Sequence, residues 1–153
     1  MTRTNAREIA VHFIFELSFS NDRADHLLEE FLTPEAFARV GEEEPLYAQF
    51  PGEKQRGYIE ELVRGVDARA EELDGYIERY AQDWRLSRID RVAVAIMRTS
   101  MYEILYMPDV PNSSSIDEAV EIAKGYENTE TCAFINGILG TFVREMVPEE
   151  RGE

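Results

Sequence analysis

The chain has 153 residues, of which 44% are hydrophobic and 31% charged, and its formal net charge is −15. This length and composition exclude a disordered tail and predict a soluble globular protein whose core needs no disulfide or metal ion. The negative charge excludes broad, nonspecific nucleic-acid binding, because it repels phosphates at long range.

Helical periodicity dominates the first third of the chain. The first predicted helix covers residues 5–19, with Asn5 as its N-cap. Two shorter helices follow, one over residues 24–31 and one that starts at Pro34 after a Thr33 cap. The first of these three helices carries an apolar stripe with a spacing of four, formed by Ile9, Phe13 and Leu17.

The middle of the chain contains an irregular stretch and then the longest periodic pattern. Residues 41–52 hold two prolines, two glycines and an acidic run, which predicts an exposed loop. Residues 54–84 show apolar positions that step mostly by three and four, as in a helix that buries one stripe. Gly65 and Gly75 interrupt this pattern, so one long helix and two consecutive helices both remain open.

The last third predicts three more helices. The first covers residues 86–107. Ser115 and Glu118 have the spacing of a capping box, which predicts that the next helix begins there. The last helix, over residues 130–147, carries a long apolar face, and residues from about 148 predict a frayed tail.

These elements predict an all-α fold, a single compact bundle of about seven helices over residues 1–153. The sequence shows no catalytic motif and no phosphate-cradling glycine motif. Its single cysteine, Cys132, and its separated histidines, His12 and His26, do not have zinc-ligand spacing, so neither a metal nor a cofactor is predicted. The single cysteine, the absence of an apolar signal segment and the absence of a membrane-length apolar run predict a cytoplasmic protein.

Several short blocks along the chain occur in a recognisable order. Together they resemble the NusB family of transcription antitermination factors over almost the full length. Any one block is a weak signal, but all of them at compatible spacing form a specific one. The blocks are Arg7-Glu8-Ile9-Ala10-Val11, Leu73-Asp74-Gly75-Tyr76-Ile77, Trp84, Ile96-Met97-Arg98 with Tyr102-Glu103, Asp117-Glu118-Ala119-Val120-Glu121-Ile122-Ala123-Lys124 and Phe134-Ile135-Asn136-Gly137-Ile138-Leu139.

The resemblance implies a function that composition and periodicity do not reveal. It implies a non-enzymatic helical domain that binds the single-stranded boxA element of nascent RNA together with NusE, a ribosomal protein. Within the RNA polymerase antitermination complex, this pair promotes read-through of terminators, notably in ribosomal RNA operons. Members occur as monomers or homodimers, so a homodimer is also implied as a possible state.

The resemblance also assigns RNA contacts to particular positions. Arginines suit phosphate oxygens, aromatic rings stack on unpaired bases, and a carboxylate accepts hydrogen bonds from base amino groups. The RNA-binding residues implied in this way are Arg3, Arg7, Phe15, Tyr80, Glu130 and Phe134.

Simpler interpretations of the same residues stay open. The two N-terminal arginines are also explained as solvated charges or as partners of nearby acids. Phe134 fits core packing, and Glu130 fits charge compensation at a helix N-terminus. The basic residues Arg85, Arg88, Arg91 and Arg98 predict either a second binding surface or salt bridges with Asp83, Asp90 and other acids.

Two other classes of function compete with RNA binding. The acidic charge and the few N-terminal arginines are equally compatible with a protein-interaction scaffold or a homodimer that contacts little RNA itself. The many carboxylates allow a hydrolase in principle, but no spacing marks two of them as a catalytic pair.

Overall fold

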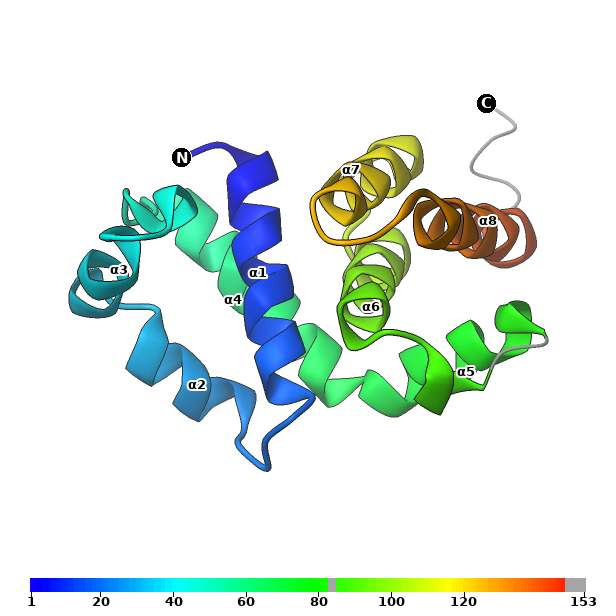
Figure 1. Ribbon diagram of the computed structural model, residues 1–153, viewed down its shortest axis with the longest axis horizontal. Helices are drawn as coiled ribbons and strands as arrows, with labels where there is room; N and C mark the ends of the chain where they lie inside the picture. Colours follow the sequence, from blue (N-terminus) through cyan, green and yellow to red (C-terminus); the bar gives the residue numbers. More distant parts are fainter. Residues whose placement is uncertain (83–84, 148–153) are drawn as a thin grey trace. The chain divides into compact units, whose positions relative to one another are not determined.

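The computed structural model describes residues 1–82 and 85–147, which form eight α-helices and no strand (Figure 1). The predicted all-α class is confirmed, with one helix more than the seven or so expected. The chain divides into two compact units, residues 1–68 and 69–153, which are called unit 1 and unit 2 here. The prediction of one domain over the whole chain stays a prediction.

Unit 1 is built on a packed pair of helices, α1 and α4, with α2 and α3 beside them (Figure 1). Ile9 on α1 and Ile59 and Leu62 on α4 are completely buried, so the apolar stripes predicted for these segments form the core of the unit. The elements of unit 1 are α1 (Arg3–Leu17), α2 (Ala24–Phe31), α3 (Pro34–Gly41), the 3-10 helix η1 (Pro45–Tyr47) and α4 (Glu53–Ala68).

Two of the four α-helices of unit 1, α1 and α3, start at threonine caps. The Thr2 hydroxyl accepts a hydrogen bond from the Asn5 amide at 3.1 Å, so α1 begins two residues before the predicted Asn5 cap. Thr33 caps α3 in the same way through the Ala36 amide, and Pro34 occupies the first turn, as predicted.

The stretch at residues 41–52 differs from the predicted exposed loop. It contains η1, whose Tyr47 is buried against the Phe37 ring, with ring centroids 4.9 Å apart. A Cβ at Gly41 would lie 2.7 Å from the Tyr47 carbonyl oxygen, so only glycine allows the end of α3 to approach η1 this closely. The acidic run at 42–44 is exposed, so the prediction is wrong only for the apolar half of the stretch.

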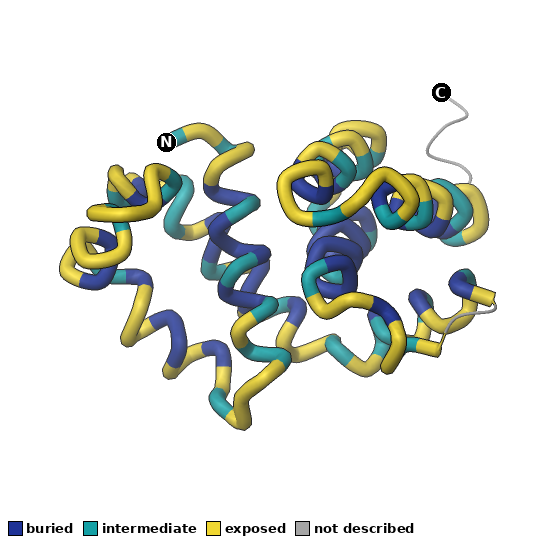
Figure 2. The backbone as a smooth tube through the Cα atoms, viewed as in Figure 1, coloured by how far each residue is buried: buried dark blue, intermediate teal, exposed yellow. Residues whose placement is uncertain are grey.

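Unit 2 is organised around α6, whose residues are buried along most of its length (Figure 2). The helices α5, α7 and α8 all pack against α6, and α8 also packs against α5 and α7. The elements of unit 2 are α5 (Ala70–Ala81), the 3-10 helix η2 (Leu86–Arg88), α6 (Arg91–Tyr106), α7 (Asn112–Lys124) and α8 (Thr129–Met146).

Two helix boundaries, at the start of α5 and at the start of α6, depart from the sequence pattern. The apolar pattern over residues 54–84 belongs to two helices, α4 and α5. The break between them lies at Arg69 rather than at Gly65 or Gly75. The helix predicted over residues 86–107 begins only at Arg91, after η2, where the Asp90 carboxylate accepts hydrogen bonds from the Val92 and Ala93 amides.

The capping box predicted at Ser115 and Glu118 is wrong. Helix α7 begins at Asn112, three residues earlier, so Ser115 lies inside the helix and is completely buried. Its hydroxyl donates to a Glu103 carboxylate oxygen at 2.8 Å and lies 2.9 Å from the Ser100 hydroxyl on α6. The predicted frayed tail from about 148 lies outside the described residues. Among the described residues, no helix is long and apolar enough to cross a membrane.

Candidate nucleic-acid interface

The two N-terminal arginines predicted to bind RNA lie on one face of α1, one turn apart. Both guanidinium groups lie over the ring of Tyr58 on α4: the Arg3 carbon Cζ is 4.5 Å from the ring centroid and the Arg7 Cζ is 5.7 Å from it. A cation over the face of an aromatic ring is attracted by the ring quadrupole. Tyr58 therefore orients both side chains and is a part of the candidate interface that the sequence patterns did not indicate.

The two arginines differ in how well a ligand can reach them. Arg7 is only 4% exposed, whereas Arg3 lies at an intermediate depth in the first turn. A phosphate contact needs an accessible guanidinium edge that can offer two donors. The structure therefore favours Arg3 over Arg7 as a direct contact, and Arg7 is better suited to hold the start of α1 against Tyr58.

Phe15 lies on α1, well away from the two arginines. Twelve residues separate it from Arg3, which corresponds to about 18 Å along a helix axis. Its ring contacts Phe19 edge to face with centroids 4.9 Å apart, and Phe19 is 61% exposed. Unit 1 therefore presents a half-exposed ring, Phe15, beside the exposed ring of Phe19 at the end of α1 opposite the arginines.

The hydroxyl of Tyr80 on α5 is hydrogen-bonded to two charged side chains. The hydroxyl donates to a Glu145 carboxylate oxygen on α8 at 3.1 Å and accepts from the Arg79 guanidinium at 3.4 Å. Its ring contacts Phe142 edge to face at a centroid distance of 6.3 Å. Tyr80 has an intermediate exposure, and the Arg79 guanidinium lies over its ring, with Cζ 5.7 Å from the centroid.

Glu130 and Phe134 lie one turn apart at the start of α8. Glu130 is exposed in the first turn, next to the Asn128 cap, and Phe134 has an intermediate exposure on the same side of the helix. Phe142, which contacts Tyr80, is twelve residues further along α8 than Glu130, which corresponds to about 18 Å along the axis. Unit 2 therefore brings Glu130 and Phe134 together and places Tyr80 at the opposite end of α8.

One arginine of the predicted basic cluster, Arg98, forms an ion pair, whereas others are exposed. Arg98 makes two hydrogen bonds to Asp74 at 2.8 and 2.7 Å, and both side chains are mostly buried. Arg85 and Arg88 are exposed, and Arg85 and Arg91 line a hollow of about 580 Å³ beside that pair. The salt-bridge interpretation is thus confirmed for Arg98, but with Asp74 as the partner. The predicted partner Asp83 lies outside the described residues.

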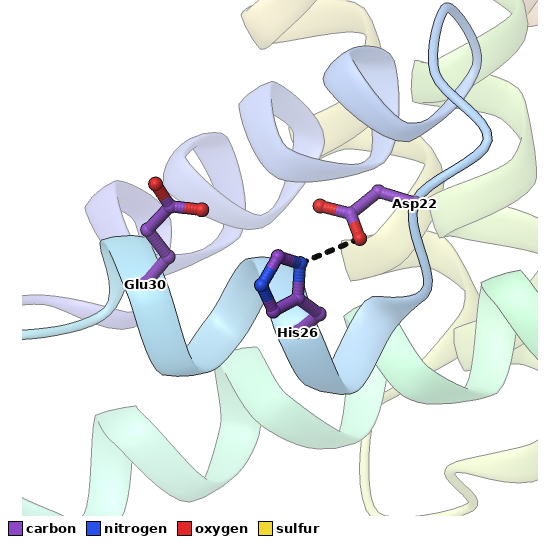
Figure 3. A group of neighbouring side chains, drawn as sticks. All are labelled: Asp22, His26 and Glu30. Carbon is purple, nitrogen blue, oxygen red and sulfur yellow. Dashed lines mark hydrogen bonds and ion pairs between the residues drawn. The ribbon is translucent and has the colours of Figure 1, made fainter.

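A second polar cluster extends along α2, from Asp22 before the helix to Glu30 near its end, where sequence spacing had predicted no metal site. Ligand atoms of Asp22, His26 and Glu30 lie within 4.8 Å of one another, and the group could hold an ion (Figure 3). His26 Nδ1 lies 2.7 Å from an Asp22 carboxylate oxygen, and this hydrogen bond raises the pKa of His26. The cluster is mostly exposed, and an ion pair between His26 and Asp22 accounts for it.

The candidate interface suits binding rather than catalysis. Each unit offers an exposed or half-exposed ring and at least one charged side chain, spread along a helix instead of converging on one atom. Stacking platforms combined with scattered charges are typical of surfaces that bind single-stranded nucleic acid.

Comparison with known proteins gives one consistent result. The family model described as the NusB family matches residues 4–144. The chain is 41% identical over 150 residues to the transcription antitermination protein NusB of Thermoanaerobacter sp. (strain X514), covering 98% of this chain and 96% of that protein. It is 38% identical over 144 residues to the protein of the same description from Acetivibrio thermocellus, covering 94% and 90%.

A solved structure agrees with these sequence matches. The structure titled "T. maritima NusB, P3121, Form 2" superimposes with a TM-score of 0.82 at 27% identity. The likeness covers 99% of this chain and 97% of that one, so the observed helices follow a known fold from end to end.

Proposed function

Because this chain belongs to the NusB family, and is therefore a non-enzymatic transcription antitermination protein, we propose that it binds a boxA-type single-stranded RNA together with the ribosomal protein NusE. The observation that carries the proposal is the match over nearly the whole chain to proteins described as antitermination factors. The proposal places the protein in the RNA polymerase antitermination complex, in the cytoplasm, and acting notably on ribosomal RNA operons.

Three side chains are best placed to contact the RNA directly. Phe134 supplies a half-exposed ring for stacking on an unpaired base, and Glu130 supplies an exposed carboxylate for a base amino group. Arg3, oriented by Tyr58, supplies a phosphate contact. Phe15 and Tyr80 extend the surface in each unit, and Arg7 supports Arg3 from its buried position.

The dependence on NusE follows from charge. The net charge is −15, and Arg3 is the better exposed of the two N-terminal arginines, so the chain alone releases few counterions from RNA. Since each phosphate contact contributes to the salt dependence of binding, the isolated chain should bind RNA weakly and with a shallow salt slope. A basic partner that shares the RNA raises both the affinity and the slope.

The test is fluorescence anisotropy with a labelled boxA RNA and a scrambled RNA at two salt concentrations, with and without NusE. BoxA-selective binding that appears with NusE is expected. Phe134→Ala should lose about 1–3 kcal/mol of binding free energy, the usual value for one stacked base. Phe50→Ala, which removes a half-exposed ring of unit 1 that is assigned neither to RNA nor to any hollow, is the matched control and should change nothing.

A second candidate function is a protein-interaction scaffold or homodimer, and the burial of Arg7 favours it. In that case NusE alone would contact the RNA, and Phe134→Ala and Glu130→Gln would leave boxA affinity unchanged while NusE binding persists. Sedimentation of the chain at micromolar concentration separates a homodimer from a monomer. Equal affinity for boxA and scrambled RNA in the presence of NusE would contradict the RNA-binding proposal.

A further inference from the structure

A hollow in unit 1 lies outside the residues assigned to RNA. It has a volume of about 470 Å³ and is lined by residues of α1, α2, α3 and the segment that carries η1. Its walls are mostly apolar, with Phe13 from α1, Leu27 from α2 and Phe37 from α3. Volumes of 300–1,000 Å³ are typical of sites that take a ligand or an inserted side chain.

Two of the three large hydrophobic residues that are exposed in unit 1 line this hollow, and the third, Phe19, does not. Four large hydrophobic residues are exposed in the described part of the chain, and two of them, Phe31 and Val40, line the hollow at 39% and 43% exposure. Single exposed apolar residues need no explanation, but two that line the same concave, mostly apolar surface are a reason to ask what covers it.

The polar atoms of the wall are already paired with each other. His12 Nδ1 and the Tyr47 hydroxyl share a hydrogen bond of 2.8 Å, and the two rings stack with centroids 5.8 Å apart. Burial lowers the pKa of His12 against the opposing charges of Glu8 and Glu44, so its ring is neutral at pH 7. The wall therefore offers a neutral, apolar surface to an occupant.

The rim of the hollow is acidic. Glu16 and Glu44 are both exposed and belong to its lining. The segment that surrounds it, from Asp22 to Glu44, contains eight acidic residues and two arginines. An occupant that inserts an apolar group here must also come close to several carboxylates, so a cationic occupant is favoured and a nucleic acid is repelled.

From this combination we propose that the hollow of unit 1 docks a short cationic peptide segment of a partner protein, which inserts one apolar side chain between Phe31 and Val40. The apolar walls take the inserted side chain, and Glu16 and Glu44 attract the flanking lysines or arginines. The hollow shares no lining residue with the proposed RNA contacts, so its test does not depend on the proposed RNA binding.

The experiment uses the full chain and amide NMR shifts with three synthetic peptides of equal length: alternating Lys and Leu, alternating Glu and Leu, and alternating Lys and Ser. The Lys–Leu peptide should shift the amides of α1, α2 and α3 around the hollow. It should bind at least about tenfold more tightly than either of the other two, because the acidic rim repels the Glu–Leu peptide and the Lys–Ser peptide has no apolar side chain to bury.

Two variants on the same helix separate docking from general attraction by the acidic protein. Val40→Lys places a like charge at the mouth of the hollow, and Ala38→Lys adds the same charge at an exposed position of α3 outside the lining. Val40→Lys should weaken binding of the Lys–Leu peptide at least about tenfold, because one apolar contact is lost and one charge repulsion is gained. Ala38→Lys should leave its affinity nearly unchanged.

Three results would overturn the proposal. The first is equal weakening by the two lysine variants, which would mean that only net charge matters. The second is equal binding of the Lys–Ser peptide, which would mean that no apolar side chain enters. The third is displacement of the peptide by a boxA oligonucleotide without NusE, which would make the hollow part of the RNA surface.

Discussion

The two units differ in what surrounds a hydrogen-bonded hydroxyl group. In unit 2, the Ser115 hydroxyl is completely buried between α7 and α6 and is hydrogen-bonded to Glu103 and Ser100. In unit 1, the Tyr47 hydroxyl is hydrogen-bonded to His12 at the wall of an open hollow. The first network is closed off by packing, whereas the second lies beside a volume that can accept another molecule.

The closed network around Ser115 has a stabilising role, whereas the polar pair at the hollow has a role in interaction. A buried polar network that is fully hydrogen-bonded fixes how two helices pack, and the loss of one member is costly. A polar pair beside an open hollow contributes less to packing but shapes a surface. We infer that the closed network holds α6 and α7 of unit 2 rigidly together, whereas the hollow of unit 1 is open to a partner.

The largest effect should come from deleting a core ring in unit 2. Phe142 is completely buried on α8 and contacts the Tyr76 ring at a centroid distance of 5.1 Å. Phe142→Ala should lower the free energy of unfolding by about 3–5 kcal/mol. Phe37→Ala in unit 1 should cost less, because the Phe37 ring already borders a hollow. Urea unfolding of both variants measures the difference, and equal losses would contradict the comparison.

The next effect tests the closed network directly. Ser115→Ala keeps the size of the side chain but leaves a Glu103 oxygen and the Ser100 hydroxyl without this partner. The free energy of unfolding should fall by about 1–3 kcal/mol, the cost of a buried polar group that loses its hydrogen bond. The control is Ser113→Ala on the exposed side of α7, which should stay within about 0.5 kcal/mol of the parent.

Ser115 also shows where prediction from sequence reached its limit. The spacing of Ser115 and Glu118 satisfies a capping box, but the same hydroxyl gains more from a buried Glu103 on another helix. A local pattern contains no information about a carboxylate that is distant in sequence. The helix consequently extends back to Asn112.

The apolar stripes were predictable because they depend only on local spacing. Ile59 and Leu62 follow the helical period and are buried, as are Ile135 and Leu139 on α8. Tyr58 was missed as the residue that orients Arg3, because a ring beside a guanidinium requires α1 and α4 to be packed together first. The RNA-binding residues themselves came from the family resemblance, and their roles stay predictions.

A pH effect should appear in unit 2 near the start of α6. Burial, a hydrogen bond with Asp90 and the Asp90 charge raise the pKa of Glu127 from 4.5 to about 7. Between these values the folded protein holds a proton that the unfolded chain has released. The free energy of unfolding should therefore fall as pH rises from about 4.5 to about 7, and then level off.

The variant Glu127→Gln tests this assignment. The amide cannot ionise and can still donate a hydrogen bond to Asp90, so the fall in stability between these pH values should disappear. At pH 8 the variant should be more stable than the parent. Glu121→Gln, at an exposed position of α7, is the matched control and should keep the parent's pH dependence. An unchanged pH profile in Glu127→Gln would show that another group titrates.

The smallest effect separates a mostly buried ion pair from an exposed one. Arg98 meets Asp74 through two parallel hydrogen bonds in unit 2, whereas the Arg64 Nε atom meets one Asp25 oxygen at 2.6 Å in unit 1, with both side chains mostly exposed. Lysine keeps the charge but cannot make two parallel hydrogen bonds. Arg98→Lys should therefore cost about 0.5–1.5 kcal/mol of unfolding free energy. Arg64→Lys should change it by less than about 0.5 kcal/mol, because exposed pairs contribute little and salt screens them.

If the two substitutions cost the same at low and at high salt, the directional contact in unit 2 contributes no more than the exposed pair in unit 1. The contrast between the units would then rest on the Ser115 network and the hollow alone.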